Sequence, residues 1–204
     1  LPIVRRAGGI PKLVRLEPPT WRLPREELAA AFSDRTKLIL FNTPMNPCSK
    51  VFDREELEFI AGLCLQHDAY AVCDEVYEHI AFDDRRHLSL MGLPGMRDRA
   101  VRIGSAGKSF SLTGWKVGYV TAAPDLMRAI AKTHQFMTFT TPPNLQAAVA
   151  YGLLWKLAFP QIVESYDQLS DAHFVSNYLP GARLPPVDAW LPWQRLDYYY
   201  TLQH

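Results

Sequence analysis

The residues with the clearest chemical potential lie between Gly104 and Tyr119, in the run GSAGKSFSLTGWKVGY. This run places Lys108 in a loop of small residues directly after an apolar segment, and a second lysine, Lys116, follows further along. Small residues let a bulky ligand approach the backbone, and the surrounding hydroxyl and amide groups can bind an anion. Lys108 could therefore bind a phosphate as a point charge, or react as a nucleophilic amine.

Two other short polar runs follow apolar segments of strand length. Asn46-Pro47 lies after the apolar run 37–41, and Asp74-Glu75-Val76-Tyr77 lies after the apolar run 69–73. Taken alone, Asn-Pro is typical of a turn, and an acidic pair after a strand is typical of a helix cap or a solvated strand end. Together with the lysine loop, these runs supply an amide, a carboxylate, a phenol, a hydroxyl and two amines. A cationic heteroaromatic cofactor that carries a phosphate would need such a set.

A competing interpretation is a nucleotide-binding phosphate loop. Gly107-Lys108-Ser109 resembles the end of such a loop, and the run 71–75 resembles the acidic strand that holds Mg²⁺ in P-loop ATPases. The motif GxxxxGK[ST] requires a glycine at position 102, where this sequence has Arg102. The phosphate loop also normally precedes the acidic strand, whereas here it follows. Spacing and order therefore disfavour this interpretation.

Composition disfavours several other classes of protein. The 204 residues are 48% hydrophobic, and the 22 basic and 21 acidic side chains are interspersed without a basic stripe, so no nucleic-acid partner is expected. The three cysteines form no CxxC pair, which fits a reducing compartment and predicts a cytoplasmic protein. The histidines lack a metal-binding spacing, so no metal site is expected. The longest uncharged run, 135–155, contains two prolines and is a poor membrane span.

The elements that would position these runs alternate between strand and helix. Apolar runs predict strands at residues 12–16, 37–41, 69–73, 100–103 and 115–122. Start signals and periodicity predict helices at residues 24–32, 53–65, 124–137, 143–155 and 162–178. The order strand, helix, strand is a βαβ unit, whose parallel strands bring their carboxyl ends to one crevice. We therefore expect an α/β fold with a mostly parallel sheet flanked by helices.

One of these helices has especially clear signals. Asp53 is a predicted N-cap, and Glu56 stands at the capping-box position three residues later. Apolar residues then follow at helical spacing, namely Leu57, Ile60, Ala61, Cys64 and Leu65. The pattern predicts an amphipathic helix between the Asn46 run and the Asp74 run.

The three polar runs in combination resemble a known family. NTPMNP at 42–47, DEVY at 74–77 and SAGKSFSLTGWKVGY at 105–119 are similar to motifs of the class I and II aminotransferases, pyridoxal-phosphate enzymes of fold type I. The lysine loop most resembles the kynurenine/glutamine and methionine aminotransferase branch. The resemblance implies a pyridoxal-phosphate-binding large domain at residues 1–158, incomplete at both ends. Residues 159–204 form an unassigned tail that could begin the small C-terminal domain.

The resemblance also implies roles for individual residues. Lys108 matches the lysine that binds the cofactor aldehyde as an aldimine and later transfers a proton, and Asp74 matches the carboxylate that keeps the pyridine nitrogen protonated. Tyr77, a further catalytic candidate, matches a group that hydrogen-bonds the phenolic oxygen of the cofactor.

Three more residues match cofactor contacts of the family. Asn46 matches a second group at the phenolic oxygen, and Ser105 and Lys116 match phosphate contacts. The implied reaction is ping-pong transamination of small-molecule amino acids and 2-oxo acids, carried out by a homodimer of the full-length form. Two alternatives remain open at this point: a C–S β-lyase, which uses the same residue types, and a truncated, non-catalytic chain that binds cofactor weakly or serves as an interaction surface.

The sequence also departs from the family pattern. Ser49 stands where the family loop has glycine, so a positive φ there would cost about 1 kcal/mol. The chain begins at Leu1, inside what is typical of folded sequence, so we expect a fragment. The arginine that binds the substrate carboxylate in the family has no clear match. Arg183 and Arg195 qualify only by residue type, and neither is assigned.

Overall fold

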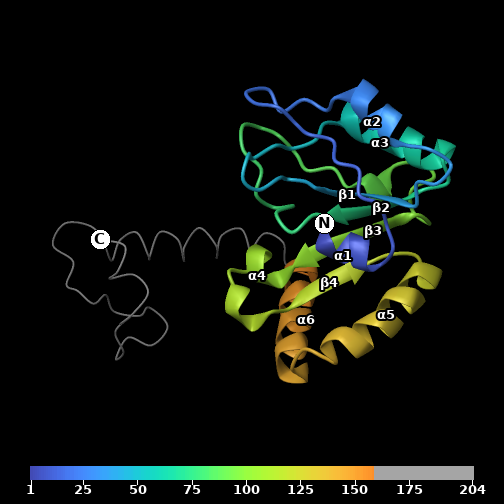
Figure 1. Cartoon of the computed structure of the whole chain (residues 1–204). Coiled ribbons are helices and arrows are strands. Elements are labelled where there is room, and N and C mark those ends of the chain that lie inside the picture. The colour runs from blue at the N-terminus through green and yellow to red at the C-terminus, as the bar shows by residue number, and fades with distance from the viewer. Residues whose placement is uncertain (159–204) are drawn as a thin grey trace. The chain divides into compact units, whose positions relative to one another are not determined.

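The computed structural model describes residues 1–158, and residues 1–146 are built around a four-stranded sheet (Figure 1). The strands lie in the order β1 (Leu38–Asn42), β2 (Tyr70–Asp74), β3 (Ala100–Ser105) and β4 (Gly118–Thr121). β1 pairs with β2, and β2 with β3, in parallel, whereas β4 is antiparallel to β3. The predicted α/β fold with a mostly parallel sheet is confirmed.

Helices precede, connect and follow these strands along the chain. The α-helices are α1 (Pro2–Arg6), α2 (Arg25–Ala31), α3 (Arg54–Gln66), α4 (Ala106–Ser109), α5 (Pro124–Thr138) and α6 (Pro143–Ala158). Two short 3₁₀ turns, η1 (Leu90–Gly92) and η2 (Thr113–Trp115), precede β3 and β4. The chain divides into two units, Leu1–Gln146 and Ala147–His204, and the sheet belongs to the first. Within residues 1–158, no helix is both long and apolar enough to cross a membrane.

Helix α3 forms where the sequence predicts it. The Asp53 carboxylate accepts a hydrogen bond from the Glu56 amide at 2.8 Å, and the Glu56 carboxylate accepts one from the Asp53 amide at 3.1 Å, which confirms the capping box. Leu57 and Cys64 are fully buried. Leu65, the last residue of the predicted stripe, is 46% exposed and lies at the margin of the packed face.

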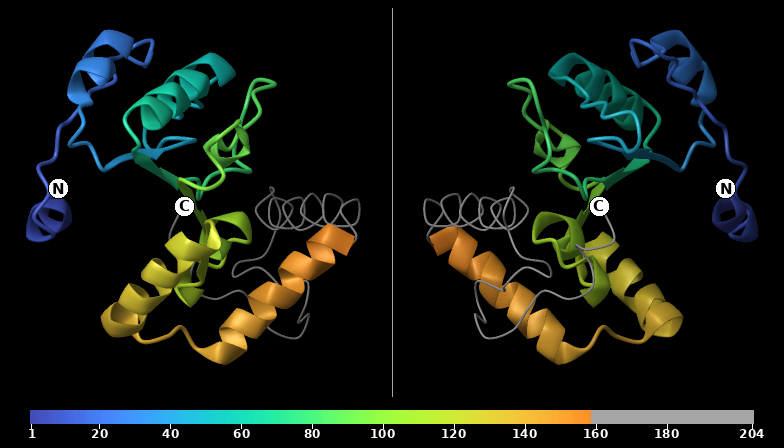
Figure 2. Two further views of the ribbon diagram at one scale, coloured as in Figure 1. Left: turned by 90° about the vertical axis from the view of Figure 1, so that its right-hand side faces the viewer. Right: turned by 90° about the vertical axis from the view of Figure 1, so that its left-hand side faces the viewer.

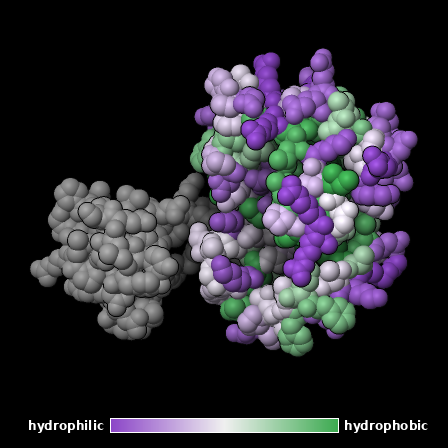
Figure 3. Space-filling model, in the orientation of Figure 1, coloured by the Kyte–Doolittle hydropathy of each residue, from purple (hydrophilic) through white to green (hydrophobic). Residues whose placement is uncertain are grey.

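The hydrophobic core lies on one face of the sheet. Figure 2 shows α2 and α3 on that side, where their apolar side chains pack against Ala71, Cys73 and Ala100 from β2 and β3. These small residues let the helices approach the strands closely. On the opposite face the side chains of Leu40 and Tyr70 are exposed. The face of the described part that Figure 3 shows mixes hydrophobic and hydrophilic side chains.

Two sequence predictions about strands need correction. The strand predicted at 12–16 is absent: Val14 and Leu16 pack against the core, but the segment pairs with no strand of the described sheet. The strand predicted at 115–122 begins only at Gly118, because Lys116 has a φ of 57°, a left-handed conformation that a strand cannot contain. The helix predicted at 162–178 and the tail 159–204 lie outside the described residues, and the domain boundary at 158 stays a prediction.

Candidate active site

The ends of the three parallel strands bring the three polar runs to one edge of the sheet. Asn42, the last residue of β1, is aligned with Asp74, the last residue of β2, and Asp74 is aligned with Ile103 of β3. The Asn46 loop, the Asp74 run and the lysine loop leave the sheet from these neighbouring positions. The convergence that the βαβ pattern predicts is therefore confirmed.

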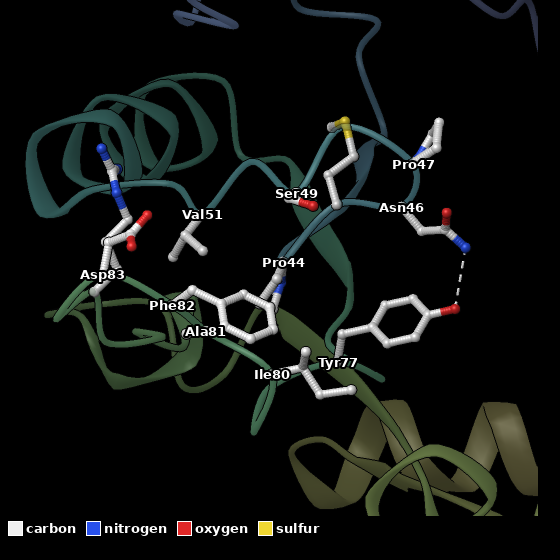
Figure 4. Close-up of a pocket in the computed structure, with 12 residues that line it drawn as sticks. Pro44, Asn46, Pro47, Ser49, Val51, Tyr77, Ile80, Ala81, Phe82 and Asp83 are labelled. Atoms are coloured by element: carbon white, nitrogen blue, oxygen red, sulfur yellow. Dashed lines mark hydrogen bonds between the residues drawn. The ribbon is translucent and has the colours of Figure 1, made fainter. Parts of the chain in front are cut away.

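Three of the predicted site residues meet directly. The Asn46 side-chain amide donates a hydrogen bond to the Tyr77 hydroxyl, with Nδ2 and Oη 3.1 Å apart (Figure 4). The Lys108 Nζ lies 5.4 Å from the centroid of the Tyr77 ring, within the range of a cation–π contact. An amide, a phenol and an amine from three separate loops thus share one small volume.

The loop that carries Asn46 is held by its own backbone. The Asn46 amide donates to the Asn42 side-chain oxygen at 3.0 Å, and the amides of Met45 and Ser49 donate to the Lys50 and Met45 carbonyls at 2.8 Å. Ser49 has a φ of 56°, so it does occupy the left-handed region that favours glycine. The positive φ on which the predicted conformational cost of Ser49 depends is therefore present.

An ion pair fastens the same loop to α3. The Lys50 ammonium lies 2.5 and 2.7 Å from the two carboxylate oxygens of Glu56, and both side chains are about nine-tenths buried, at 10% and 8% exposure. Glu56 also accepts a hydrogen bond from the Leu23 amide at 3.0 Å. Glu56 consequently joins the N-terminal segment, the Asn46 loop and the start of α3.

Asp74 presents a half-buried carboxylate at the end of β2. Its Oδ1 accepts only a long hydrogen bond, 3.4 Å, from the Val76 amide, and it forms no ion pair with another described residue. Its carbonyl accepts from the Asn42 side chain at 2.8 Å and from the Thr43 amide at 3.0 Å, which fixes the strand end. The carboxylate is thus held by its backbone and remains available to a cationic partner.

Glu75 behaves differently from its neighbour. The typical interpretation of an acidic pair, a helix cap or a solvated end, is wrong for Glu75, which is fully buried. Its carboxylate lies 2.9 Å from His87 Nε2 and accepts hydrogen bonds from the Ser89 hydroxyl at 2.9 Å and from Arg102 Nε at 2.8 Å. We call these three partners the Glu75 cage. Strand alternation could have revealed it, since Glu75 follows Ala71 and Cys73 on the core face.

The lysine loop is compact around Gly107. A Cβ added at Gly107 would lie 3.0 Å from the Thr113 Cα and 3.2 Å from the Ser105 hydroxyl, so the loop depends on glycine there. The Thr113 hydroxyl donates to the Gly107 carbonyl at 2.9 Å. Lys108 is exposed on α4, and the Ser109 hydroxyl beside it is buried without a hydrogen-bond partner in the described part of the chain.

Ser105 and Lys116 flank this loop. The structure places Ser105 at the end of β3, and Lys116 is exposed after η2. Neither side chain makes a hydrogen bond or ion pair with another residue of the range 1–158, so the structure does not join them directly to Asn46, Tyr77 or Lys108. Both remain available to an anion.

A cavity of about 410 Å³ adjoins the Asn46–Tyr77 pair. It lies between the loop 44–51 and the segment 77–85, and its lining is mainly apolar, with Pro44, Ile80 and Phe82 facing it (Figure 4). Lys108, Asp74, Ser105 and Lys116 do not line it. Asn46 and Tyr77 therefore border this cavity, and the other four candidate site residues lie outside its lining.

Comparison with known proteins places this geometry in a family. The model of the family "Aminotransferase class I and II" matches residues 1–171. The chain belongs to this family. Kynurenine–oxoglutarate transaminase 1 of Rattus norvegicus is 46% identical over 160 residues, which cover 73% of this chain and 38% of that protein. Methionine aminotransferase of Escherichia coli is 39% identical over 149 residues, covering 73% and 39%.

Solved aminotransferase structures share the fold. The crystal structure of YbdL from Escherichia coli, identified with a methionine aminotransferase function, matches with a TM-score of 0.72 and 34% identity over 86% of this chain and 47% of that one. N-Succinyldiaminopimelate aminotransferase from Mycobacterium tuberculosis also gives a TM-score of 0.72, with 31% identity over 87% and 48%. The chain therefore spans less than half the length of the rat kynurenine–oxoglutarate transaminase 1 and of the Escherichia coli methionine aminotransferase.

The residues present in this chain fit pyridoxal phosphate. The cofactor has a basic ring nitrogen, an acidic phenol, an aldehyde and a phosphate. The chain offers the Asp74 carboxylate, which has no ion-pair partner within residues 1–158, and the paired Asn46 and Tyr77. It also offers the exposed amine of Lys108, the Ser105 hydroxyl and the Lys116 ammonium. The buried Ser109 hydroxyl next to Lys108 is a further donor without a partner among the described residues. Each polar group of the cofactor thus has a chemically matched group at this sheet edge.

Proposed function

We propose that the whole protein is a pyridoxal-phosphate-dependent aminotransferase that moves an amino group from an amino acid to a 2-oxo acid. The observation that carries the proposal is the meeting of Asn46, Tyr77 and Lys108 at the same strand ends as Asp74. The names of the relatives, a kynurenine–oxoglutarate transaminase and a methionine aminotransferase, favour transamination over β-elimination. A homodimer of the full-length form is part of the same proposal.

In this proposal the bound cofactor supplies an aldehyde carbon and an electron-withdrawing ring. Asp74 holds a proton on the ring nitrogen, because a carboxylate in a partly buried site favours a cationic partner. Lys108 Nζ first holds the cofactor at its aldehyde carbon and then moves a proton from the substrate Cα. Its position over the Tyr77 ring keeps the Lys108 amine close to the Tyr77 side chain.

The remaining groups bind and orient. The Asn46 amide and the Tyr77 hydroxyl donate to the phenolic oxygen, and their mutual hydrogen bond sets the direction of both. Ser105 and Lys116 bind the phosphate, the first as a hydroxyl donor and the second as a cation. Lys116 has a left-handed backbone, with a φ of 57°. Such strained conformations are common at binding sites, which agrees with a role for its side chain in phosphate binding.

The direct test uses the visible absorbance of added pyridoxal phosphate. The wild-type chain should develop a visible band, and borohydride reduction followed by peptide mass analysis should place the cofactor on Lys108. Lys132→Ala, which alters an exposed lysine of α5, is the matched control and should keep the band, whereas Lys108→Ala should lose it. Amino acids should bleach the band, and a 2-oxo acid should restore it. No band, or a band that persists in Lys108→Ala, would overturn the assignment.

A further inference from the structure

Tyr77 is presented by a short turn, and its side chain contributes little to holding that turn. Within residues 1–158 the polar contacts of the Tyr77 side chain are the hydrogen bond from Asn46, which is itself exposed, and the cation–π contact with Lys108. The turn is closed by the Glu78 amide, which donates to the Glu75 carbonyl at 3.0 Å. The direction of the Tyr77 hydroxyl must therefore be set by what fixes the two ends of the turn.

A single arginine contacts both ends. Arg102 of β3 donates from Nε to the Glu75 carboxylate at 2.8 Å, and its Nη2 forms an ion pair with the Glu78 carboxylate. The Glu75 side chain is 0% exposed and that of Glu78 is 9% exposed, so both contacts are shielded from water. Charged hydrogen bonds in such surroundings are stronger than those at the surface. The two carboxylates bracket Tyr77, and Arg102 ties them together.

The far end of the turn has a second attachment. The Tyr119 hydroxyl of β4 donates to Glu78 Oε1 at 2.8 Å. Tyr119 reaches this position because it lies over Gly104: a Cβ added at Gly104 would be only 2.1 Å from the Tyr119 ring. Glu78 is thus bound by β3 through Arg102 and by β4 through Tyr119. The turn is therefore anchored to two strands of the sheet.

We propose that Arg102 is a positioning residue for the Tyr77 hydroxyl, and through it for the phenolic oxygen of the cofactor. The role in cofactor binding rests on the proposed function, whereas the clamp on the turn does not. Loss of Arg102 removes the cation that Glu75 and Glu78 share. Glu75 keeps its contacts with His87 and Ser89, and Glu78 keeps those with His79 and Tyr119, but the two carboxylates are no longer tied together, so they repel each other and the turn loosens. Tyr77 then loses its fixed direction toward Asn46.

The first experiment measures amide hydrogen exchange in the cofactor-free chain. In Arg102→Gln the amides of Glu78 and Ile80, which close the turn, should exchange about tenfold faster. Arg99→Gln is the matched control, because Arg99 precedes the same strand and pairs at 3.0 Å with the exposed Asp68. It should leave both amides unchanged. Equal exchange in the wild type and Arg102→Gln would overturn the clamp, and Glu78→Gln gives a second variant should Arg102→Gln fold poorly.

The second experiment asks whether the clamp acts through Tyr77. The midpoint pH of the bound cofactor's visible band should rise by about one unit in Arg102→Gln, because the phenolic oxygen loses a donor, and Arg102→Lys should restore part of the shift. In a Tyr77→Phe background the Arg102→Gln change should have no further effect, whereas a merely structural role would give an additive one. An unchanged midpoint or additive shifts would overturn the proposal. If the wild type forms no band, the proposed function fails and the exchange result still decides the clamp.

Discussion

Replacing Lys50 with methionine should destabilise the chain strongly, because the change leaves Glu56 without its cation. The Glu56 carboxylate then keeps only the Leu23 and Asp53 amides, at 3.0 and 3.1 Å, in a site where its side chain is 8% exposed. Methionine has nearly the length of the lysine stem, so apolar packing near the Phe52 ring is kept, whereas the cation–π contact of the ammonium, 5.0 Å from the ring centroid, is lost. The measured effect therefore reports mainly the uncompensated Glu56 charge, with a smaller part from the lost cation–π contact.

The size of the effect follows from this burial. Removing one partner of a buried ion pair costs about 3–5 kcal/mol, against about 0–1 kcal/mol for a pair at the surface. For a chain of this length, each kcal/mol lowers Tm by roughly 2–4 °C. Lys50→Met should consequently lower Tm by on the order of 10 °C, and the loss should be visible in urea unfolding followed by tryptophan fluorescence.

Two further variants make this test decisive. Arg54→Met removes an exposed i,i+4 pair, in which Arg54 and Glu58 are 3.5 Å apart with side chains 62% and 54% exposed, and should cost less than about 0.5 kcal/mol. Lys50→Met combined with Glu56→Gln should recover much of the loss, because the buried charge is gone. A cost for Lys50→Met as small as that of Arg54→Met would refute the reasoning.

Two further substitutions and one labelling experiment also have expected outcomes. Ser49→Gly should raise the free energy of unfolding by about 1 kcal/mol in urea titrations, because φ is 56° at this position, and an unchanged stability would contradict the strain. Gly104→Ala should cost about 1–3 kcal/mol, since its Cβ would collide with the Tyr119 ring, and a neutral result would show that the ring can move freely. Burial raises the pKa of the Cys64 thiol to about 11, so iodoacetamide at pH 8 should label the half-buried Cys48 first and reach Cys64 only after unfolding or as the pH approaches 11, as peptide masses will show.

Local signals in the sequence predicted the parts of this structure that depend on neighbouring residues. Asp53 and Glu56 satisfy each other within one helical turn, so their capping box is visible in the sequence. The strand ends at Asn42 and Asp74 follow from apolar runs that a crossover helix separates, which fixes parallel pairing. The predicted meeting of Asn46 and Tyr77 followed from the same topology and from the family resemblance.

Long-range polar contacts were beyond such signals. Glu56 binds the Lys50 ammonium and the Leu23 amide in addition to its cap partner Asp53. Nothing in the spacing of these residues indicates the contact with Leu23. Val14 lies in an apolar run without a strand, because side-chain burial alone does not provide the backbone partner that a strand needs. The left-handed φ of Lys116 likewise depends on the turn around it. Lysine has no preference for this conformation, so the residue type does not predict it.

The alternation of side chains along β2 has a consequence for folding fidelity. Asp74 and Glu75 are adjacent acidic residues that belong to opposite faces, so a slip of one residue against β1 and β3 would exchange them. Asp74, one methylene shorter, would then face the Glu75 cage, and Glu75 would face the opposite side of the sheet. Such a slipped chain would bury a charge that its partners cannot fully reach. The Glu75 cage therefore disfavours the slipped alignment, and so the packing of the core helps to keep Asp74 on the face opposite to it.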